Sequence, residues 1–156
     1  MKLEYEDKVN LVTSTIPRKN KATAEDFNDI KTVVNANDGV KVYDKLNNTT
    51  ANITFDENIS NYPMIEVFWK CNREVLGGTK TFYGSERIID PIGKCFNVNL
   101  LARYSDTKQN GCTATYEISA TGITLVASAS YELNHAGTYA MNTQNSVYIT
   151  RVLAYA

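Results

Sequence analysis

The chain has 156 residues and a formal net charge of -1 at pH 7. This length suits one compact domain, and the near-neutral charge provides no basic footprint for nucleic acid or an anionic membrane surface. The N-terminal residues are acidic where a secretory signal has its apolar segment, and no apolar run approaches the roughly eighteen residues of a membrane span. We therefore expect neither nucleic-acid binding nor membrane insertion, and a protein made in the cytoplasm.

The first part of the chain can be interpreted in two ways. Residues 1–16 mix charged side chains with a short β-prone run, Val9–Ile16, and Pro17 then interrupts the chain. This pattern fits either an arm or a first strand. Residues 1–22 are assigned as an N-terminal arm.

One helix is well marked, within residues 23–36. Thr23 is a suitable N-cap, and the seam of Phe27, Ile30 and Val34 repeats at spacings of three and four. A helix of roughly twelve residues is marginal in water by itself, so the seam needs a partner. Either three copies bury one another or the helix packs on its own domain. The segment 23–50 is assigned as helix and linker, a candidate neck for trimerisation.

From about Ala51 onward the sequence changes to short β-branched and aromatic runs separated by Gly, Asn, Asp and Pro. Seven runs predict a mainly β fold, an antiparallel, jelly-roll-like β-sandwich head over residues 51–156. The predicted strands are Asn52–Phe55, Met64–Lys70, Lys80–Tyr83, Cys95–Tyr104, Cys112–Ser119, Ile123–Leu133 and Val147–Tyr155.

Alternation assigns faces to three of these runs. Ile65, Val67 and Trp69 share one face, and Phe96, Val98 and Leu100 share another. Between Ile123 and Leu133, the odd-numbered Ile123, Leu125, Ala127, Ala129 and Tyr131 are expected on one face.

Three dipeptides are typical of hairpin turns: Gly77-Gly78, Thr121-Gly122 and Asn110-Gly111. The last is the strongest type I′ signal in the chain. These short links favour antiparallel neighbours.

The three cysteines, Cys71, Cys95 and Cys112, lie far apart in the sequence. They match neither a paired disulfide framework nor a Cys-x-x-Cys metal motif. We expect reduced and mostly buried thiols, no metal site and no cofactor.

The sequence contains no motif for catalysis. His135 is the single histidine, and it has no nucleophile motif around it. Carboxylates such as Asp56, Glu66 and Glu86 could pair as in glycosidases, but spacing in the sequence does not assign such a pair. A non-enzymatic protein is expected.

Aromatic residues are the more informative group, with ten Tyr, five Phe and one Trp. Sugar rings stack on aromatic side chains while their hydroxyls bind short polar groups. Packing in the core or at a subunit interface remains the alternative for each residue, and Trp69 is expected in the core. The candidate ligand contacts, chosen for positions in or near loops, are Tyr104, Asp106, Tyr131, His135 and Tyr139.

Lys8–Asn35, KVNLVTSTIPRKNKATAEDFNDIKTVVN, resembles a segment of tail-fibre and baseplate receptor-binding proteins from bacteriophages and prophages of Gram-positive hosts. Three further segments are similar to a companion β domain of these proteins: YPMIEVFWKCN from Tyr62, KCFNVNLLARYS from Lys94 and NSVYITRVLAYA from Asn145. Together the four segments cover most of the chain.

The resemblance implies a homotrimeric component of the virion tail, made in the host cytoplasm, with Phe27, Ile30 and Val34 at the trimer interface. Its expected partners are a cell-surface glycan or teichoic acid and other tail or baseplate proteins. A purely structural trimer, with recognition by another protein, is the alternative.

Overall fold

The computed structural model describes residues 38–134, 136, 139–142 and 145–156. The arm at residues 1–22 and the helix expected at residues 23–36 lie outside the described residues. Phe27, Ile30 and Val34, the expected trimer contacts, therefore lie outside them too.

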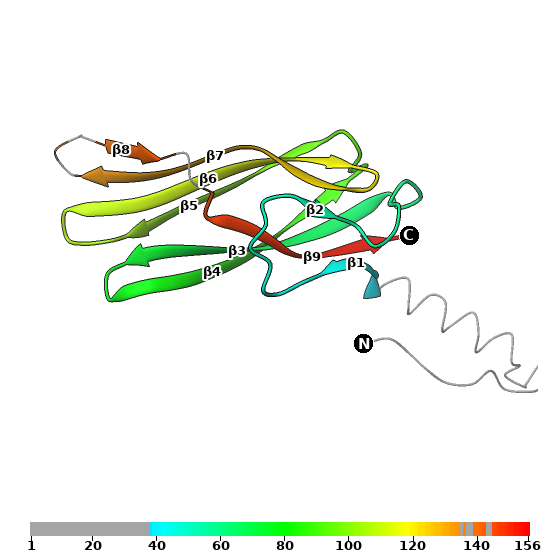
Figure 1. The fold of residues 1–156 in the computed structure, drawn as a ribbon, viewed down its shortest axis with the longest axis horizontal. Coiled ribbons are helices and arrows are strands. Elements are labelled where there is room, and N and C mark those ends of the chain that lie inside the picture. Colours follow the sequence, from blue (N-terminus) through cyan, green and yellow to red (C-terminus); the bar gives the residue numbers. More distant parts are fainter. Residues whose placement is uncertain (1–37, 135, 137–138, 143–144) are drawn as a thin grey trace, which may run out of the picture.

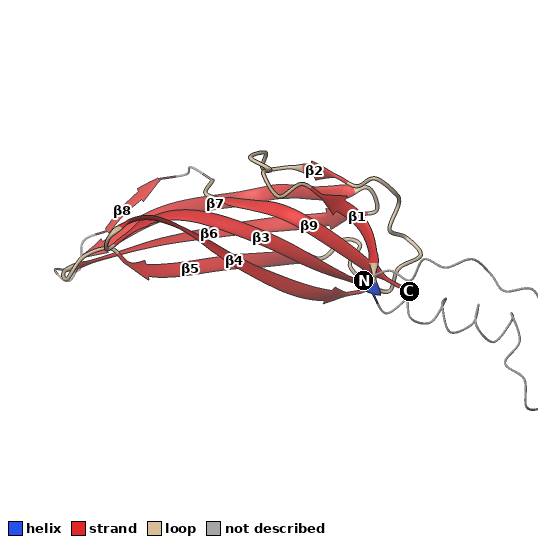
Figure 2. Cartoon of the chain, turned by 90° about the horizontal axis from the view of Figure 1, so that it is seen from below, coloured by secondary structure: helices blue, strands red, loops and turns tan. Residues whose placement is uncertain are grey.

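The described part of the chain is almost entirely β-structure (Figures 1 and 2). Its nine strands are, in chain order, β1 (Val40–Asp44), β2 (Ile53–Thr54), β3 (Met64–Val75), β4 (Gly78–Ile89), β5 (Cys95–Arg103), β6 (Lys108–Ser119), β7 (Gly122–Asn134), β8 (Tyr139–Asn142) and β9 (Val147–Tyr155).

The strands form two antiparallel sheets. Sheet A has the order β1-β9-β3-β4, and sheet B has the order β2-β7-β6-β5, with β8 paired to β7. Most neighbours are consecutive hairpin strands, as the short turns predicted. The antiparallel β-sandwich is thus confirmed, and all seven predicted runs are strands. Two short strands, β1 and β8, were not predicted.

The elongated sandwich has two different ends (Figure 1). The hairpins β3–β4, β5–β6 and β7–β8 turn at one end, which we call the hairpin end. The start of β1 and the C-terminus of the chain lie at the other. Because β1 pairs with β9, the sandwich begins at Val40, ahead of the expected boundary at residue 51.

Alternation positions the core between the sheets. In β3, Ile65 and Val67 are fully buried and Trp69 packs against the core from the same face, as predicted. In β5, Phe96 and Val98 are buried and Leu100 packs beside them. These faces meet across the interior because a sandwich buries one side of each sheet.

The expected face of β7 is correct only in its first part. Ile123 and Leu125 face inward, opposite Ile118 and Tyr116 of β6. A bulge then leaves Val126 unpaired, and the register resumes with Ala127 opposite Thr115. An extra residue reverses the alternation. Tyr131 therefore lies on the outer face of sheet B, opposite the predicted side.

The turn signals have mixed outcomes. Gly77-Gly78 does form the β3–β4 turn, with positive φ at both residues. The turn expected at Thr121-Gly122 begins one residue earlier, since β6 ends at Ser119 and β7 starts at Gly122. The turn expected at Asn110-Gly111 is wrong, because both residues lie inside β6.

Gly111 has a packing role instead of a turning role. A Cβ atom there would lie 2.3 Å from Cε2 of Tyr131, whose ring covers the glycine from the neighbouring strand. The dipeptide signal failed because a glycine that admits an aromatic ring is indistinguishable, in sequence, from one that admits a turn.

The cysteines are mostly buried, as expected. Cys71 and Cys112 are buried as predicted, whereas Cys95 is exposed. All three are free thiols, as expected, but the first two are adjacent in space although 41 positions apart in sequence, a proximity that spacing did not indicate.

Gly84, like Gly111, leaves space for an aromatic ring, here the ring of Trp69. A Cβ atom at Gly84 would lie 2.3 Å from Trp69 Cζ2, and Trp69 cannot retreat freely because it packs on the core. We expect Gly84→Ala to lower the free energy of unfolding by about 1–2 kcal/mol through overpacking. Urea denaturation measures the loss, and emission from Trp69, the single tryptophan, reports the displaced ring.

Ser85→Ala is the matched control, because Ser85 is the exposed neighbour and makes only an exposed hydrogen bond to Glu66. Equal stability and unchanged emission for Gly84→Ala would contradict this account of the glycine.

Candidate functional site

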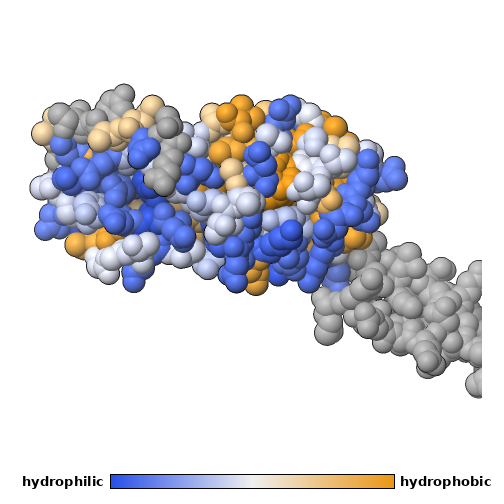
Figure 3. Space-filling model, in the orientation of Figure 1, coloured by the Kyte–Doolittle hydropathy of each residue, from blue (hydrophilic) through white to orange (hydrophobic). Residues whose placement is uncertain are grey.

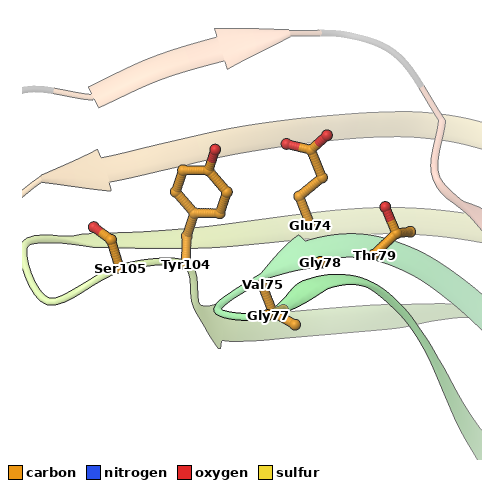
Figure 4. A pocket seen from close by; sticks show the side chains of 7 residues that line it. All are labelled: Glu74, Val75, Gly77, Gly78, Thr79, Tyr104 and Ser105. Atoms are coloured by element: carbon orange, nitrogen blue, oxygen red, sulfur yellow. The ribbon is translucent and has the colours of Figure 1, made fainter.

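The hairpin end of the sandwich carries a hollow of about 460 Å³ between two turns (Figure 4). The β3–β4 hairpin lines one side and the start of the β5–β6 turn lines the other. The lining residues are Glu74, Val75, Gly77, Gly78, Thr79, Tyr104 and Ser105.

Backbone hydrogen bonds hold the two turns in place. Leu76 N donates to Arg103 O at 3.0 Å, which joins the β3–β4 hairpin to the end of β5. Tyr104 N and Ser105 N both donate to Lys108 O, at 3.0 and 3.1 Å, and close the β5–β6 turn. The side chains of the hollow therefore project from a backbone that is tied on both sides.

Side chains tie the sheets together at the same end. Asn110 Nδ2 donates to Glu74 O at 3.1 Å, across from sheet B to sheet A. Arg73 extends the other way, with Nη2 donating to Gly111 O and Nη1 donating to Ser146 Oγ at 3.2 Å. A scaffold tied in both directions can hold a preformed site.

The lining groups combine an aromatic ring with short polar groups. In Figure 4 the Tyr104 hydroxyl, the Glu74 carboxylate and the Thr79 hydroxyl point the same way, and Ser105 lies beside Tyr104. Tyr104 is half-buried, so part of its ring meets solvent. This pairing of a partly accessible ring with hydroxyl and carboxylate groups suits a ligand with apolar faces and hydroxyl edges.

Two basic side chains at the β5–β6 turn beside the hollow, Arg103 and Lys108, have acidic partners. Arg103 pairs with Asp106 within the β5–β6 turn. Lys108 Nζ lies 2.8 Å from Glu132 Oε1, and this hydrogen-bonded carboxylate raises the pKa of Lys108. The charge that lines the hollow itself is the carboxylate of Glu74. These pairings favour a neutral ligand over an anionic one.

Two other hollows are larger but offer less to a ligand. The first, of about 560 Å³, is lined by Tyr43 and by residues within the segment 45–54. The second, of about 550 Å³, is lined by the end of β4 and the start of β5, including Phe96. Tyr43 and Phe96 are 3% and 5% exposed, respectively. Their rings belong to the core, so neither hollow presents an aromatic face.

The predicted contacts do not form a single site. Tyr104 lines the hollow, whereas the exposed Asp106 pairs with Arg103 beyond its lining. Tyr131 lies on the outer face of sheet B over Gly111. Tyr139 begins β8, opposite Leu133, and His135 lies outside the described residues.

No sequence signal selects Glu74 and Thr79, which also line the hollow. They flank the Gly77-Gly78 turn, which was recognised, but the turn that packs beside it was not recognisable from local sequence. The β5–β6 turn lies beside the Gly77-Gly78 turn because of burial and hydrogen bonding between the two sheets.

The outer face of sheet B carries a second cluster. Leu101, Gly111, Tyr131 and Met141 occupy one row across β5, β6, β7 and β8. Leu101 and Met141 are 52% and 64% exposed, and Tyr131 is half-buried between them. We call these residues the outer row. In the view of Figure 3, by contrast, the hairpin end is mostly hydrophilic and stronger hydrophobic side chains gather toward the other half.

The described ranges contain neither a cluster of metal-ligating side chains nor a membrane-spanning helix. Within them, no three His, Cys, Asp or Glu side chains gather as metal ligands would. Among the same residues, no helix has the length and apolar character needed to cross a membrane. Comparisons of the chain with protein-family models, curated proteins and solved structures found no match.

Proposed function

We propose that this chain is a non-enzymatic tail-fibre or baseplate protein of a bacteriophage or prophage, and that its hairpin end binds a saccharide on the surface of a Gram-positive host. The sequence resemblance supports the tail assignment. The hollow beside Tyr104 is the observation that carries the binding proposal.

The chemistry of the hollow favours a neutral saccharide over teichoic acid. A sugar ring can stack on Tyr104 while Glu74, Thr79 and Ser105 accept or donate hydrogen bonds to its hydroxyls. A phosphate-rich polymer would meet the Glu74 carboxylate, and the nearby Arg103 and Lys108 are paired with Asp106 and Glu132. Like charge at that position would weaken binding.

A trimer suits the orientation of the sandwich. In the proposal, three helices pack through Phe27, Ile30 and Val34 and lead into β1, which starts at the end opposite the hairpins (Figure 1). Three hollows then point away from the stem, and repeated weak binding on one particle produces avidity. Light scattering tests this part, because a trimer has three times the 17.4 kDa of one chain.

We expect Tyr104→Ala to weaken binding to the matching glycan about tenfold, which corresponds to roughly 1.4 kcal/mol of lost stacking. Purified protein is applied to a glycan array and to cells of Gram-positive strains, with wall teichoic acid as a separate probe. Tyr83→Ala is the matched control, since Tyr83 is 74% exposed in mid-β4 and does not line the hollow.

Equal loss in both variants, or no loss in either, would contradict a site at Tyr104. Stronger binding to teichoic acid than to neutral glycans would overturn the choice of ligand. No binding by the parent protein across strains and glycans would contradict recognition altogether.

The outer row favours a second candidate, a structural tail part whose recognition is done by another protein. Exposed apolar side chains that lie side by side are typical of subunit interfaces. Tyr131→Ala separates the candidates. Loss of the trimer indicates a structural role for the outer row, whereas lost cell binding by an intact trimer indicates recognition.

A further inference from the structure

Two cysteine side chains face each other across the interior of the sandwich. Cys71 lies on β3 of sheet A and Cys112 on β6 of sheet B, and they are 0% and 1% exposed. Their Sγ atoms are 3.0 Å apart. This separation is about 1 Å longer than the covalent S–S bond of about 2.04 Å.

The strands on either side keep the two thiols opposed. Cys71 follows Val67 and Trp69 on the inner face of β3, and Cys112 precedes Ala114 and Tyr116 on the inner face of β6. Packed sheets lie about 10 Å apart on average, and the Cys71 and Cys112 side chains meet within that space with their sulfurs 3.0 Å apart. A bond between them would close a segment of 41 positions and join the two sheets covalently.

The surroundings favour one thiol as the nucleophile. A hydrogen bond joins the two sulfurs, and this bond, together with the Arg73 guanidinium and the Leu100 backbone, lowers the pKa of Cys112 against the effect of burial. The same hydrogen bond raises the pKa of Cys71. The thiolate is the reactive form in disulfide exchange, so Cys112 is the first to react.

We propose that Cys71 and Cys112 form a disulfide that ties sheet A to sheet B when the protein meets a small-molecule disulfide as oxidant. The Cys112 thiolate attacks one sulfur of the oxidant, forms a mixed disulfide and expels one thiolate, which takes up a proton. Cys71 then loses its proton and attacks Sγ of Cys112, expelling the second thiolate. Two cysteine thiols are oxidised, and one small disulfide is reduced to two thiols.

Burial determines when the reaction occurs. Both sulfurs are closed to solvent in the folded sandwich, so the oxidant reaches them during folding or local opening. Cys95 is exposed on the outer face of sheet B, opposite Glu117, and is not part of the pair. Replacing it in the experiment leaves Cys71 and Cys112 as the two thiols under test.

The experiment uses the full chain with Cys95→Ala, reduced, unfolded in urea and refolded with oxidised and reduced glutathione. Trypsin cleaves after Lys70 and Arg73, and after Lys108 and Arg151, so each cysteine falls in its own peptide. We expect the two peptides to be linked within one chain on non-reducing mass spectrometry, and the link to disappear on reduction. The oxidised protein is expected to melt roughly 10 °C above the reduced protein.

Cys71→Ala in the same background is the control, and it should leave one titratable thiol with no redox-dependent melting shift. Circular dichroism confirms that each variant is folded. Two free thiols after oxidative refolding would overturn the proposal, and so would links found only between chains. A linked form that melts below the reduced form would overturn the stabilising role.

Discussion

Replacing Asn48 by alanine is expected to lower the free energy of unfolding by about 2–4 kcal/mol, because it removes four hydrogen bonds from a buried site. Asn48 Nδ2 donates to Ile149 O at 2.9 Å and to Thr50 O at 3.0 Å. Its Oδ1 accepts from Thr50 N at 2.9 Å and from Thr50 Oγ1 at 2.7 Å. Asn48 itself is 8% exposed.

The position of Asn48 explains why the loss is large. The β1–β9 pairing ends at Asp44 opposite Arg151, and Lys45 N continues it with a 2.8 Å bond to Thr150 O. The Asn48 side chain then acts as the next rung, because it donates to Ile149 O on the side of β9 where the β1 pairing has ended. Alanine leaves that buried carbonyl without this donor.

Urea denaturation measures the loss of unfolding free energy, and the m-value is expected to stay unchanged. Asn58→Ala is the matched control, because Asn58 is exposed and accepts a single 2.8 Å bond from Ser60 N. If the two variants were equally stable, the side-chain rung would contribute nothing measurable.

Ionisation of Tyr116 is expected to remove up to about 3 kcal/mol of stability in alkaline solution. Burial raises the pKa of Tyr116 to about 12 from 10.0, against a smaller opposing contribution from Asn145. The raised value means that the fold disfavours the phenolate. This contribution is complete below pH 10 and is lost as the pH rises from 10 towards 12.

The contacts of Tyr116 account for the penalty. The ring is fully buried and stacks on Phe96 with centroids 5.3 Å apart. The hydroxyl donates to Val147 O at 2.7 Å, from sheet B to sheet A. A phenolate cannot donate, so ionisation breaks this bond between the sheets and leaves a charge in the core.

Tyr116→Phe separates this residue from the other tyrosines. At neutral pH the variant should lose about 1 kcal/mol with the hydrogen bond. Its stability should then fall less steeply between pH 10 and 12 than that of the parent, as measured by urea denaturation at each pH. Parallel pH profiles would show that Tyr116 has no special part in alkaline unfolding.

Local sequence predicted the strands well because strand formation depends on near neighbours. Alternation over β3 and β5 correctly assigned Ile65, Val67, Phe96 and Val98 to the interior. The same rule failed in β7 because the bulge at Val126 depends on how β6 pairs, which no local pattern encodes. The candidate contacts show the same contrast. Tyr104 was predicted from its position near a loop and does line a hollow, whereas Glu74 and Thr79 lie beside it only because the packing of the two sheets brings the β3–β4 turn close.

By itself, the sequence determined that this protein is a β-sandwich of consecutive antiparallel hairpins, because periodicity, β-branched residues and the Gly77-Gly78 turn act over a few residues. Tertiary structure alone decided that Tyr131 faces outward over Gly111, that Asn48 extends the edge of β9, and that Cys71 meets Cys112. Each of these depends on segments far apart in the chain, whose register and packing are selected only when the two sheets close on a common core.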